Sequence, residues 1–289
     1  MMLVSTFQFL LILVCLNHIA SETEHHLNSI FLSGEFTDYC QLPCPRAPQH
    51  TLCVRPNAPA KTPEQCDKFQ HLLDSPDLLY TILDTHNGVR NRYAIRFRVA
   101  NMKKLVWDNE LARMARLHLA ACERYALDPC TQLDNPSVYD RDYRNVRQNK
   151  AFVLERYLPK YYAIDVLRNW YLQKDATPDP QVIDSFKLQQ SVLNNFTLLT
   201  WATLERVGCA AAKYRDGFQL VCNYFPFYSL AEPSAELGLA GQHCPRTFPL
   251  RSKIFDGLCT FEMDEAAGRE LSRALATLPL FCLWLWRMW

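Results

Sequence analysis

Cysteine content is the feature that most constrains this chain. Twelve cysteines occur in 289 residues, and they include Cys15 in an N-terminal stretch, residues 1–20, that joins an apolar run to Ala20. This stretch has the layout of a signal peptide, although it carries no Lys or Arg, and its apolar run is too short to span a bilayer. Setting aside Cys15 and Cys282, which lies in an apolar tail, leaves ten cysteines. An even number of cysteines behind a signal peptide predicts five disulfides in a secreted, extracellular protein.

The alternative use of the cysteines is metal binding. The sequence contains no CxxC pair and no Cys/His cluster with finger-like spacing, so zinc-cysteine chemistry is not expected. The formal net charge of +1 provides no long-range field that would attract nucleic acid. A local basic stretch is expected to form a solvated helix face and loop. It comprises Arg90, Arg92, Arg96, Arg98, Lys103 and Lys104.

Composition divides the chain into six segments. These are a signal peptide at 1–20, a polar leader at 21–39, a cysteine-rich N-terminal extension at 40–74, a main domain at 75–228, a C-terminal extension at 229–262 and a hydrophobic tail at 263–289. The tail is apolar for only about a dozen residues, too few for a membrane span. Because it follows Ala266-Ala267-Gly268, it resembles a lipid-anchor attachment signal. Contact with a membrane is expected only if this tail anchors the chain.

Apolar residues at helical spacing predict three helices early in the main domain. Ser75-Pro76-Asp77 provides an N-cap and a proline at the first helical position, so the first helix begins there. The second helix begins after Trp107 with Asp108 as its cap. The expected inward positions are Leu79, Ile82, Leu83 and His86 on the first; Leu111, Met114, Ala115, His118, Ala121 and Cys122 on the second; and Ala163, Val166, Leu167, Trp170 and Tyr171 on the third.

The pattern changes to strands after the helices. Residues 197–204, 207–214 and 218–225 are rich in β-branched and aromatic residues and predict three strands. The last two are joined through Arg215-Asp216-Gly217, a tight hairpin that brings Cys209 and Cys222 nearly opposite each other. Helices followed by hairpin-linked strands indicate an α+β class, with helices covering an antiparallel sheet in two or three layers.

Several strings, in order and spacing, resemble the signature segments of the CAP superfamily, which comprises the cysteine-rich secretory, antigen 5 and pathogenesis-related 1 proteins. They are HNGVRN at 86–91, NMKKLVWDNELARMA at 101–115, NFTLLTWATLERVGCAAAKY at 195–214 and LVCNYFP at 220–226. The segment DYCQLPCPRAPQHTLC at 38–53 is similar to the insect venom antigen 5 branch. The resemblance covers roughly residues 38–228 and implies a three-layer αβα sandwich, the CAP fold, with a disulfide-stapled N-terminal extension.

The resemblance also implies the disulfide pairing. Four pairs follow from the family: Cys40 with Cys53, Cys44 with Cys130, Cys66 with Cys122, and Cys209 with Cys222. Cys244 and Cys259 are the two that remain, and we expect them to form a fifth pair.

Many CAP proteins carry a cation-binding cleft of two histidines and two acids, and this chain departs from it at every position. Ala126 or Leu127 stands at the first histidine, Gln148 at the first acid, Gln173 at the second acid and Asn195 at the second histidine. Amides are weak neutral ligands for zinc-like ions and cannot serve as general bases. We therefore expect a degenerate cleft with no bound metal and no other cofactor. Asn195-Phe196-Thr197 is also a glycosylation sequon, so Asn195 is a predicted glycan acceptor.

Other candidate residues are expected to be structural. His86 and His118 are predicted to be hydrogen-bonded core histidines, and the aromatic residues near Trp170 are predicted to be core, with a lipid or sterol groove as the alternative. The resulting hypothesis is a non-enzymatic extracellular scaffold that binds an unidentified protein. The alternatives are a small-lipid or sterol carrier and, more remotely, a metal-dependent hydrolase.

Overall fold

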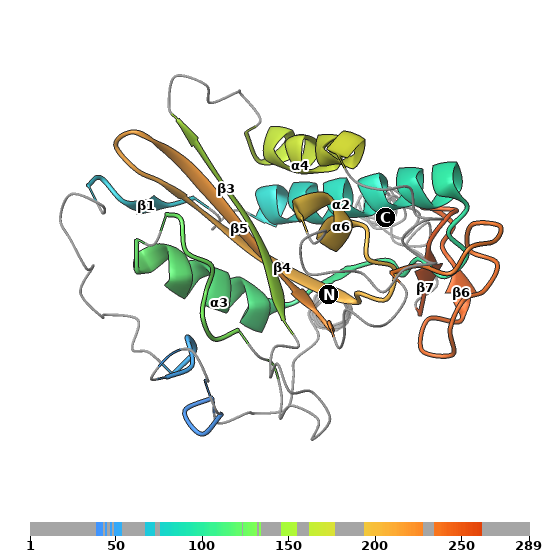
Figure 1. Cartoon of the computed structure of the whole chain (residues 1–289), viewed down its shortest axis with the longest axis horizontal. Coiled ribbons are helices and arrows are strands. Elements are labelled where there is room, and N and C mark those ends of the chain that lie inside the picture. The colour runs from blue at the N-terminus through green and yellow to red at the C-terminus, as the bar shows by residue number, and fades with distance from the viewer. Residues whose placement is uncertain are drawn as a thin grey trace, which may run out of the picture. The chain divides into compact units, whose positions relative to one another are not determined.

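The computed structural model describes residues 39–42, 44, 47, 49–53, 67–72, 76–122, 124–131, 133, 146–154, 162–176, 194–227 and 234–261 (Figure 1). The predicted signal peptide, Cys66 and the hydrophobic tail lie outside these residues, as does the polar leader apart from Tyr39. The chain forms two compact units. Unit 1 contains Met1–Leu79, Val106–Lys160 and Arg206–Phe227, and unit 2 contains Tyr80–Leu105, Tyr161–Glu205 and Tyr228–Trp289.

Unit 1 is built on a five-stranded sheet. Its strands are β1 (Gln70–His71), β2 (Val106–Trp107), β3 (Arg147–Leu154), β4 (Arg206–Lys213) and β5 (Gly217–Phe225). Their order is β1-β4-β5-β3, and β2 runs parallel beside β4. The predicted hairpin is confirmed, because β4 and β5 pair in a register that sets Cys209 against Cys222. β3 was not predicted, because its first four residues, Arg-Gln-Asn-Lys, are polar and poor in β-branched side chains.

Helix α3 (Asn109–Ala120) contacts β4 and β5 of this sheet (Figure 1). Its predicted cap is confirmed, since the Asp108 side chain accepts hydrogen bonds from the backbone N–H groups of Glu110 and Leu111. The approach of helix to strand is close enough to require glycine at Gly208, where a Cβ would lie 2.2 Å from the Ala112 nitrogen. Of the predicted inward positions, Leu111, Met114, Ala115 and His118 are buried on α3, as is Leu119, which was not predicted. The helix ends at Ala120, so the other two predicted positions, the half-buried Ala121 and the buried Cys122, lie just beyond it.

Unit 2 contains most of α2 (Pro76–Phe97), together with α4 (Tyr162–Leu172), the short 3-10 helix η2 (Gln173–Ala176), α6 (Asn195–Leu199), β6 (Leu250–Arg251) and β7 (Cys259–Thr260). Tyr93 of α2 and Phe196 of α6 meet edge to face in its core, with ring centroids 5.5 Å apart. The C-terminal extension packs here through backbone bonds. The Cys259 N–H donates to the Met102 carbonyl, and the Lys104 N–H donates to the Cys259 carbonyl.

The strand predicted at 197–204 is wrong. Residues 195–199 form α6, and residues 200–205 continue as turn and loop. The reason is local capping: the Asn194 side chain accepts from the Thr197 N–H while the Thr197 hydroxyl accepts from the Asn194 N–H, which completes a capping box. This reciprocal pair favours a helix start over the β-propensity of the residues that follow.

The expectation for the basic stretch is wrong at Arg90 and Lys103. The exposed fraction of Arg90 is 0% and that of Lys103 is 9%, whereas Arg92, Arg96 and Arg98 are exposed as predicted. The Arg90 guanidinium donates to five backbone carbonyl oxygens at 2.7 to 3.4 Å. They belong to Lys103, Leu199, Trp201, Ala202 and Leu204. Arg90 thus holds the loop that replaces the predicted strand.

Four disulfides join described cysteines, and each is one of the expected pairs. They are Cys40–Cys53, Cys44–Cys130, Cys209–Cys222 and Cys244–Cys259. Cys122 is also disulfide-bonded, and its expected partner Cys66 lies outside the described residues. Among the helices that the structure describes, none is long and apolar enough to cross a bilayer.

Candidate functional site

Residues 125–127, which lie between Cys122 and Cys130, form an exposed loop in unit 1. Tyr125 is 85% exposed and Leu127 is 53% exposed, and Ala126 between them is also exposed. Ala126 or Leu127 is the residue predicted at the family's first histidine, and Leu127 is the larger of the two. Leu127 therefore presents an aliphatic side chain to solvent near the position where many CAP proteins carry a histidine. We call residues 125–127 the display loop.

Both sides of the display loop are anchored to the sheet. The Arg124 guanidinium forms an ion pair with Asp216 at 2.6 Å and lies over the rings of Phe152 and Tyr214, at 5.0 and 5.2 Å from their centroids. Gln219 of β5 donates to the Arg124 carbonyl at 3.3 Å. Lys150 of β3 donates to the Ala126 carbonyl. A backbone fixed at these points displays its side chains with little remaining freedom.

Gln148, at the family's first acid, has its amide engaged on both sides. Its Oε1 accepts from the Asp128 N–H at 3.0 Å, and its Nε2 donates to Asn223 Oδ1 at 2.9 Å. Asn223 lies opposite Gln148 in the β3–β5 register, and its Nδ2 donates to the Leu111 carbonyl at 3.0 Å. The amides therefore form one directed chain from the loop, through two strands, to α3. The chain requires a side chain at position 148 that accepts on one side and donates on the other, as a neutral amide does and an ionised carboxylate does not.

The other two predicted cleft residues lie in unit 2. Gln173 is the first residue of η2 and Asn195 the first of α6, and these two short helices contact each other. Asn195 follows the cap residue Asn194, and the sequon threonine, Thr197, is buried with its hydroxyl used in the capping box. Leu127 and Gln148 belong to unit 1, so the structure describes the four positions as two pairs, one in each unit.

The donor set does not fit a zinc-like cation. One position holds an exposed aliphatic side chain, and the other three hold amides. At Gln148 the amide oxygen already accepts a backbone hydrogen bond, which a bound cation would have to displace. Zinc sites use imidazole, thiolate or carboxylate donors, none of which these four residues supply.

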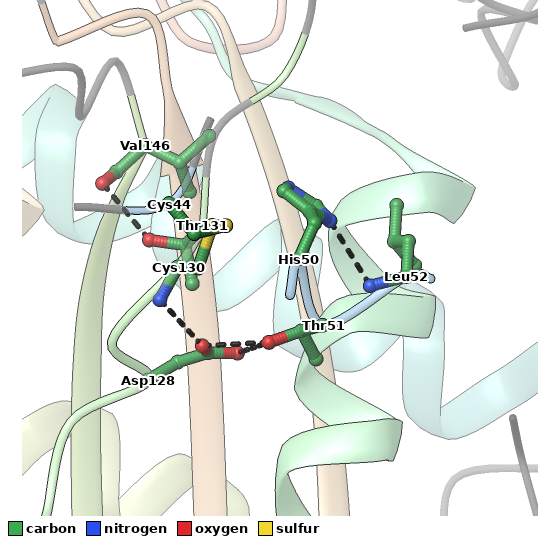
Figure 2. The surroundings of a disulfide bond; sticks show 8 residues. All are labelled: Cys44, His50, Thr51, Leu52, Asp128, Cys130, Thr131 and Val146. Carbon is green, nitrogen blue, oxygen red and sulfur yellow. Dashed lines mark hydrogen bonds between the residues drawn. A yellow bond between two sulfur atoms is a disulfide. The ribbon is translucent and has the colours of Figure 1, made fainter. Parts of the chain in front are cut away.

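Asp128 is a functional candidate that sequence reasoning missed. Its side chain is 4% exposed, and both carboxyl oxygens lie 2.7 Å from the Thr51 hydroxyl oxygen of the N-terminal extension (Figure 2). Oδ1 also accepts from the Cys130 N–H at 3.0 Å. Burial, only partly offset by these hydrogen bonds, raises the pKa of Asp128 from 3.8 to about 6. An acid beside Pro129 gives no sequence signal of burial, because it depends on a segment 77 residues away.

The predicted core histidines lie where expected. His86 is fully buried with Nδ1 at 2.8 Å from the Ile82 carbonyl, and burial lowers its pKa to about 4. His118 is buried on α3. Trp170 is buried on α4, and Tyr171 packs against the core of unit 2 with its ring 5.9 Å from that of Phe196. Their positions in or against the buried cores agree with the prediction that they are core residues.

Comparison with known proteins agrees with the motifs. Residues 83–224 match the family described as "CAP: Cysteine-rich secretory protein family". This segment is a CAP domain. "Venom allergen-1" of Aedes aegypti is 26% identical over 247 residues, which cover 80% of this chain and 91% of that protein. "Venom allergen 5" of Vespula maculifrons is 24% identical over 212 residues, 67% of this chain and 86% of that protein, so the predicted likeness to insect relatives is confirmed.

The resemblance extends beyond insect proteins. "Peptidase inhibitor 15" of Homo sapiens is 28% identical over 202 residues, which cover 63% of this CAP protein and 69% of the human one. Among solved structures, "Crystal structure of NaASP2 with Zn2+" aligns with a TM-score of 0.52 at 17% identity and covers 64% of this chain and 96% of that one. "Crystal Structure of Hookworm Platelet Inhibitor" aligns with a TM-score of 0.50 at 16% identity and covers 68% and 97%. At these identities the structures show the CAP fold and α+β class that the motifs predict.

Proposed function

We propose that this CAP protein is a non-enzymatic extracellular scaffold that binds another protein through its display loop. The proposal rests on the residues that occupy two of the family's cation-binding positions in unit 1. Leu127 is an exposed aliphatic residue and Gln148 is committed to a hydrogen-bonded amide chain. One solved CAP structure is described as containing Zn2+, whereas the residues here supply neither a metal ligand nor a general base.

The display loop has the properties of a protein-binding surface. Tyr125 and Leu127 expose an aromatic and an aliphatic side chain two residues apart in the chain. Exposed tyrosines often become the energetic centre of an interface once a partner buries them. Because Arg124, the Ala126 carbonyl and Asp128 are all anchored to unit 1, binding would cost little loop ordering. This surface therefore supports a protein partner with an apolar pocket.

Affinity capture from the native fluid tests this proposal. The immobilised wild-type protein is compared with Tyr125→Ser and with Leu239→Ser, which removes another exposed apolar side chain in unit 2, where Leu239 is 60% exposed. We expect a protein retained by wild type and by Leu239→Ser to lose at least about tenfold in affinity for Tyr125→Ser. A partner bound equally by all three would contradict the display loop. Stoichiometric lipid extracted from purified protein would instead favour a carrier, and micromolar zinc binding by calorimetry would overturn the degenerate cleft.

The proposal includes secretion and a glycan at Asn195. The even set of cysteines and the four disulfides described above support an oxidising compartment. Expression in insect cells should yield extracellular protein that begins after Ala20, with a mass that falls when an N-glycosidase is added and does not fall in Asn195→Gln. Protein retained on cells until a phospholipase specific for lipid anchors is added would show that the tail is an anchor. Cytosolic, reduced protein would contradict the proposal.

A further inference from the structure

When the Asp128 carboxyl is ionised, both of its oxygens face Thr51 as acceptors, but the Thr51 hydroxyl has only one hydrogen to donate. The single Thr51 hydroxyl oxygen lies 2.7 Å from Oδ1 and 2.7 Å from Oδ2 (Figure 2). One hydroxyl donates one hydrogen, so it either satisfies one of these contacts fully or divides a weaker bond between the two. A proton on the carboxyl supplies the second. In that state Oδ1 accepts from the Thr51 hydroxyl and the Cys130 N–H, and Oδ2 donates to the Thr51 oxygen.

We infer that Asp128 and Thr51 form an acid-strengthened clasp, which holds residues 49–53 of the N-terminal extension against residues 128–131 more firmly when the Asp128 carboxyl is protonated. The clasp is a property of unit 1 alone. It requires no partner and does not depend on the proposed function, although Asp128 directly follows the display loop.

The burial of the carboxyl supports this protonation. Asp128 is 4% exposed, and its raised pKa, about 6, has desolvation as its first cause and the bonds from Thr51 and Cys130 as opposing causes. An ionised carboxylate at this position has only neutral donors among the residues described. A protonated carboxyl carries no charge to desolvate and completes the pair with Thr51.

The charged and titratable groups described on the surrounding segments include His50, Tyr39, Glu110 and Lys150. His50 stacks on Tyr39 and its Nδ1 accepts from the Leu52 N–H at 3.0 Å. The Tyr39 hydroxyl donates to Glu110 of α3. Lys150 of β3 donates to the Ala126 carbonyl. The Leu52 amide therefore reports on His50 as well as on the clasp.

The direction of the pH effect follows from proton linkage. A carboxyl whose pKa is higher in the closed state than in the open state takes up a proton on closing, so the closed state is favoured as pH falls. The effect is absent well above the closed-state pKa of about 6 and complete below the ordinary value of 3.8. Between about pH 7.5 and about pH 5, the closing equilibrium should rise about tenfold.

The segment that the clasp holds is otherwise well packed, which confines the effect to local opening. Leu52 belongs to a buried cluster with Leu111 and Met114 of α3. The Cys40–Cys53 and Cys44–Cys130 disulfides keep the extension attached in every state. The observable is therefore the protection of a few amides, not release of the extension.

Amide hydrogen exchange of the intact, oxidised chain tests the clasp. After correction for the intrinsic pH dependence of exchange, we expect protection of the Cys130 and Cys53 amides to rise about tenfold from about pH 7.5 to about pH 5. The Leu72 amide, which donates to Ala211, should not change and serves as an internal reference.

Two variants separate the clasp from other titrations. In Asp128→Asn the amide replaces the protonated carboxyl in both hydrogen-bonding roles, so protection should equal the acid level of wild type at both pH values. Asp84→Asn removes an exposed acid on α2 and should respond as wild type does. No rise in wild type, or the same rise in Asp128→Asn, would overturn the inference. If Asp128→Asn fails to fold, the carboxyl of the wild-type chain can be titrated by carbon-13 NMR, where a midpoint near the ordinary value of 3.8 in place of about 6 would also overturn it.

Discussion

Two irregular segments of this protein are held by buried ionisable side chains, and they are held in opposite ways. In unit 2 the Arg90 guanidinium donates to the backbone of residues 199–204 and to Lys103. In unit 1 the Asp128 carboxyl accepts from Thr51 and from the Cys130 N–H. Both side chains are nearly inaccessible, with exposed fractions of 0% and 4%. The two side chains differ in how well their partners offset the free energy lost when each charge leaves water.

The number and kind of partners decide the answer. Arginine carries five N–H donors in a fixed plane and stays protonated throughout the physiological range. Five carbonyl dipoles point toward it here, so the buried charge is well solvated by the backbone. A carboxyl with two donors is less well compensated and can discharge itself by binding a proton, which is why its pKa rises. We therefore expect the stability of residues 199–204, which Arg90 holds, to be independent of pH. The stability of residues 49–53, which Asp128 holds, should depend on pH.

The largest expected effect is that of Arg90→Met. The substitution leaves the buried carbonyls of residues 199–204 without their donor, so we expect a loss of about 4 kcal/mol in the free energy of unfolding. Denaturant unfolding at several pH values measures it. Since arginine does not titrate, the difference between variant and wild type should be constant from about pH 5 to about pH 8.

Arg92→Met is the matched control, because Arg92 lies on the same helix but is exposed. It should change the unfolding free energy by less than about 0.5 kcal/mol. A small effect of Arg90→Met, below about 1 kcal/mol, would mean that these carbonyls find water or other donors, and the contrast between the two segments would fail.

The regular elements near both segments were predictable from sequence. Asp108 caps α3, and apolar residues at helical spacing mark the buried faces of α3 and α4, because capping and periodicity are local signals. The β4–β5 hairpin was predicted from the turn at 215–217 and from the β-branched and aromatic residues on either side of it. Family resemblance supplied the cysteine pairs, which spacing alone leaves open.

What could not be predicted depends on contacts far apart in the chain. Arg90 was expected to be solvated because nothing local shows that residues 199–204 turn their carbonyls toward it. Asp128 was overlooked because its partner, Thr51, lies in the N-terminal extension. Gln148 was identified as a cleft position, but its bonds to Asp128 and Asn223 appear only once β3 pairs with β5. In each case the missing information is tertiary.

A smaller effect is expected for Gln148→Glu, which restores the acid that the family carries at this position. The substitution places a second carboxyl close to Asp128. The new carboxylate would face Asn223 Oδ1, which now accepts from the Gln148 amide. Asn223 cannot turn its amide around without losing its bond to the Leu111 carbonyl. One buried acceptor is therefore left facing another, and we expect a loss of about 2 kcal/mol at neutral pH.

This loss should shrink as pH falls, because a protonated carboxyl can donate to Asn223 as the amide does. The added negative charge beside Asp128 should also raise the pKa of Asp128 above its value of about 6, so wild type and variant should converge at mildly acid pH. Gln242→Glu makes the same charge change at an exposed site and should have little effect at any pH. Urea unfolding of the three proteins at about pH 5 and about pH 7.5 measures these differences in unfolding free energy.

An equal loss for Gln148→Glu at both pH values would contradict this account and show that the substitution disrupts the amide chain sterically. A gain in zinc affinity accompanying Gln148→Glu would show that this position can still serve as a ligand.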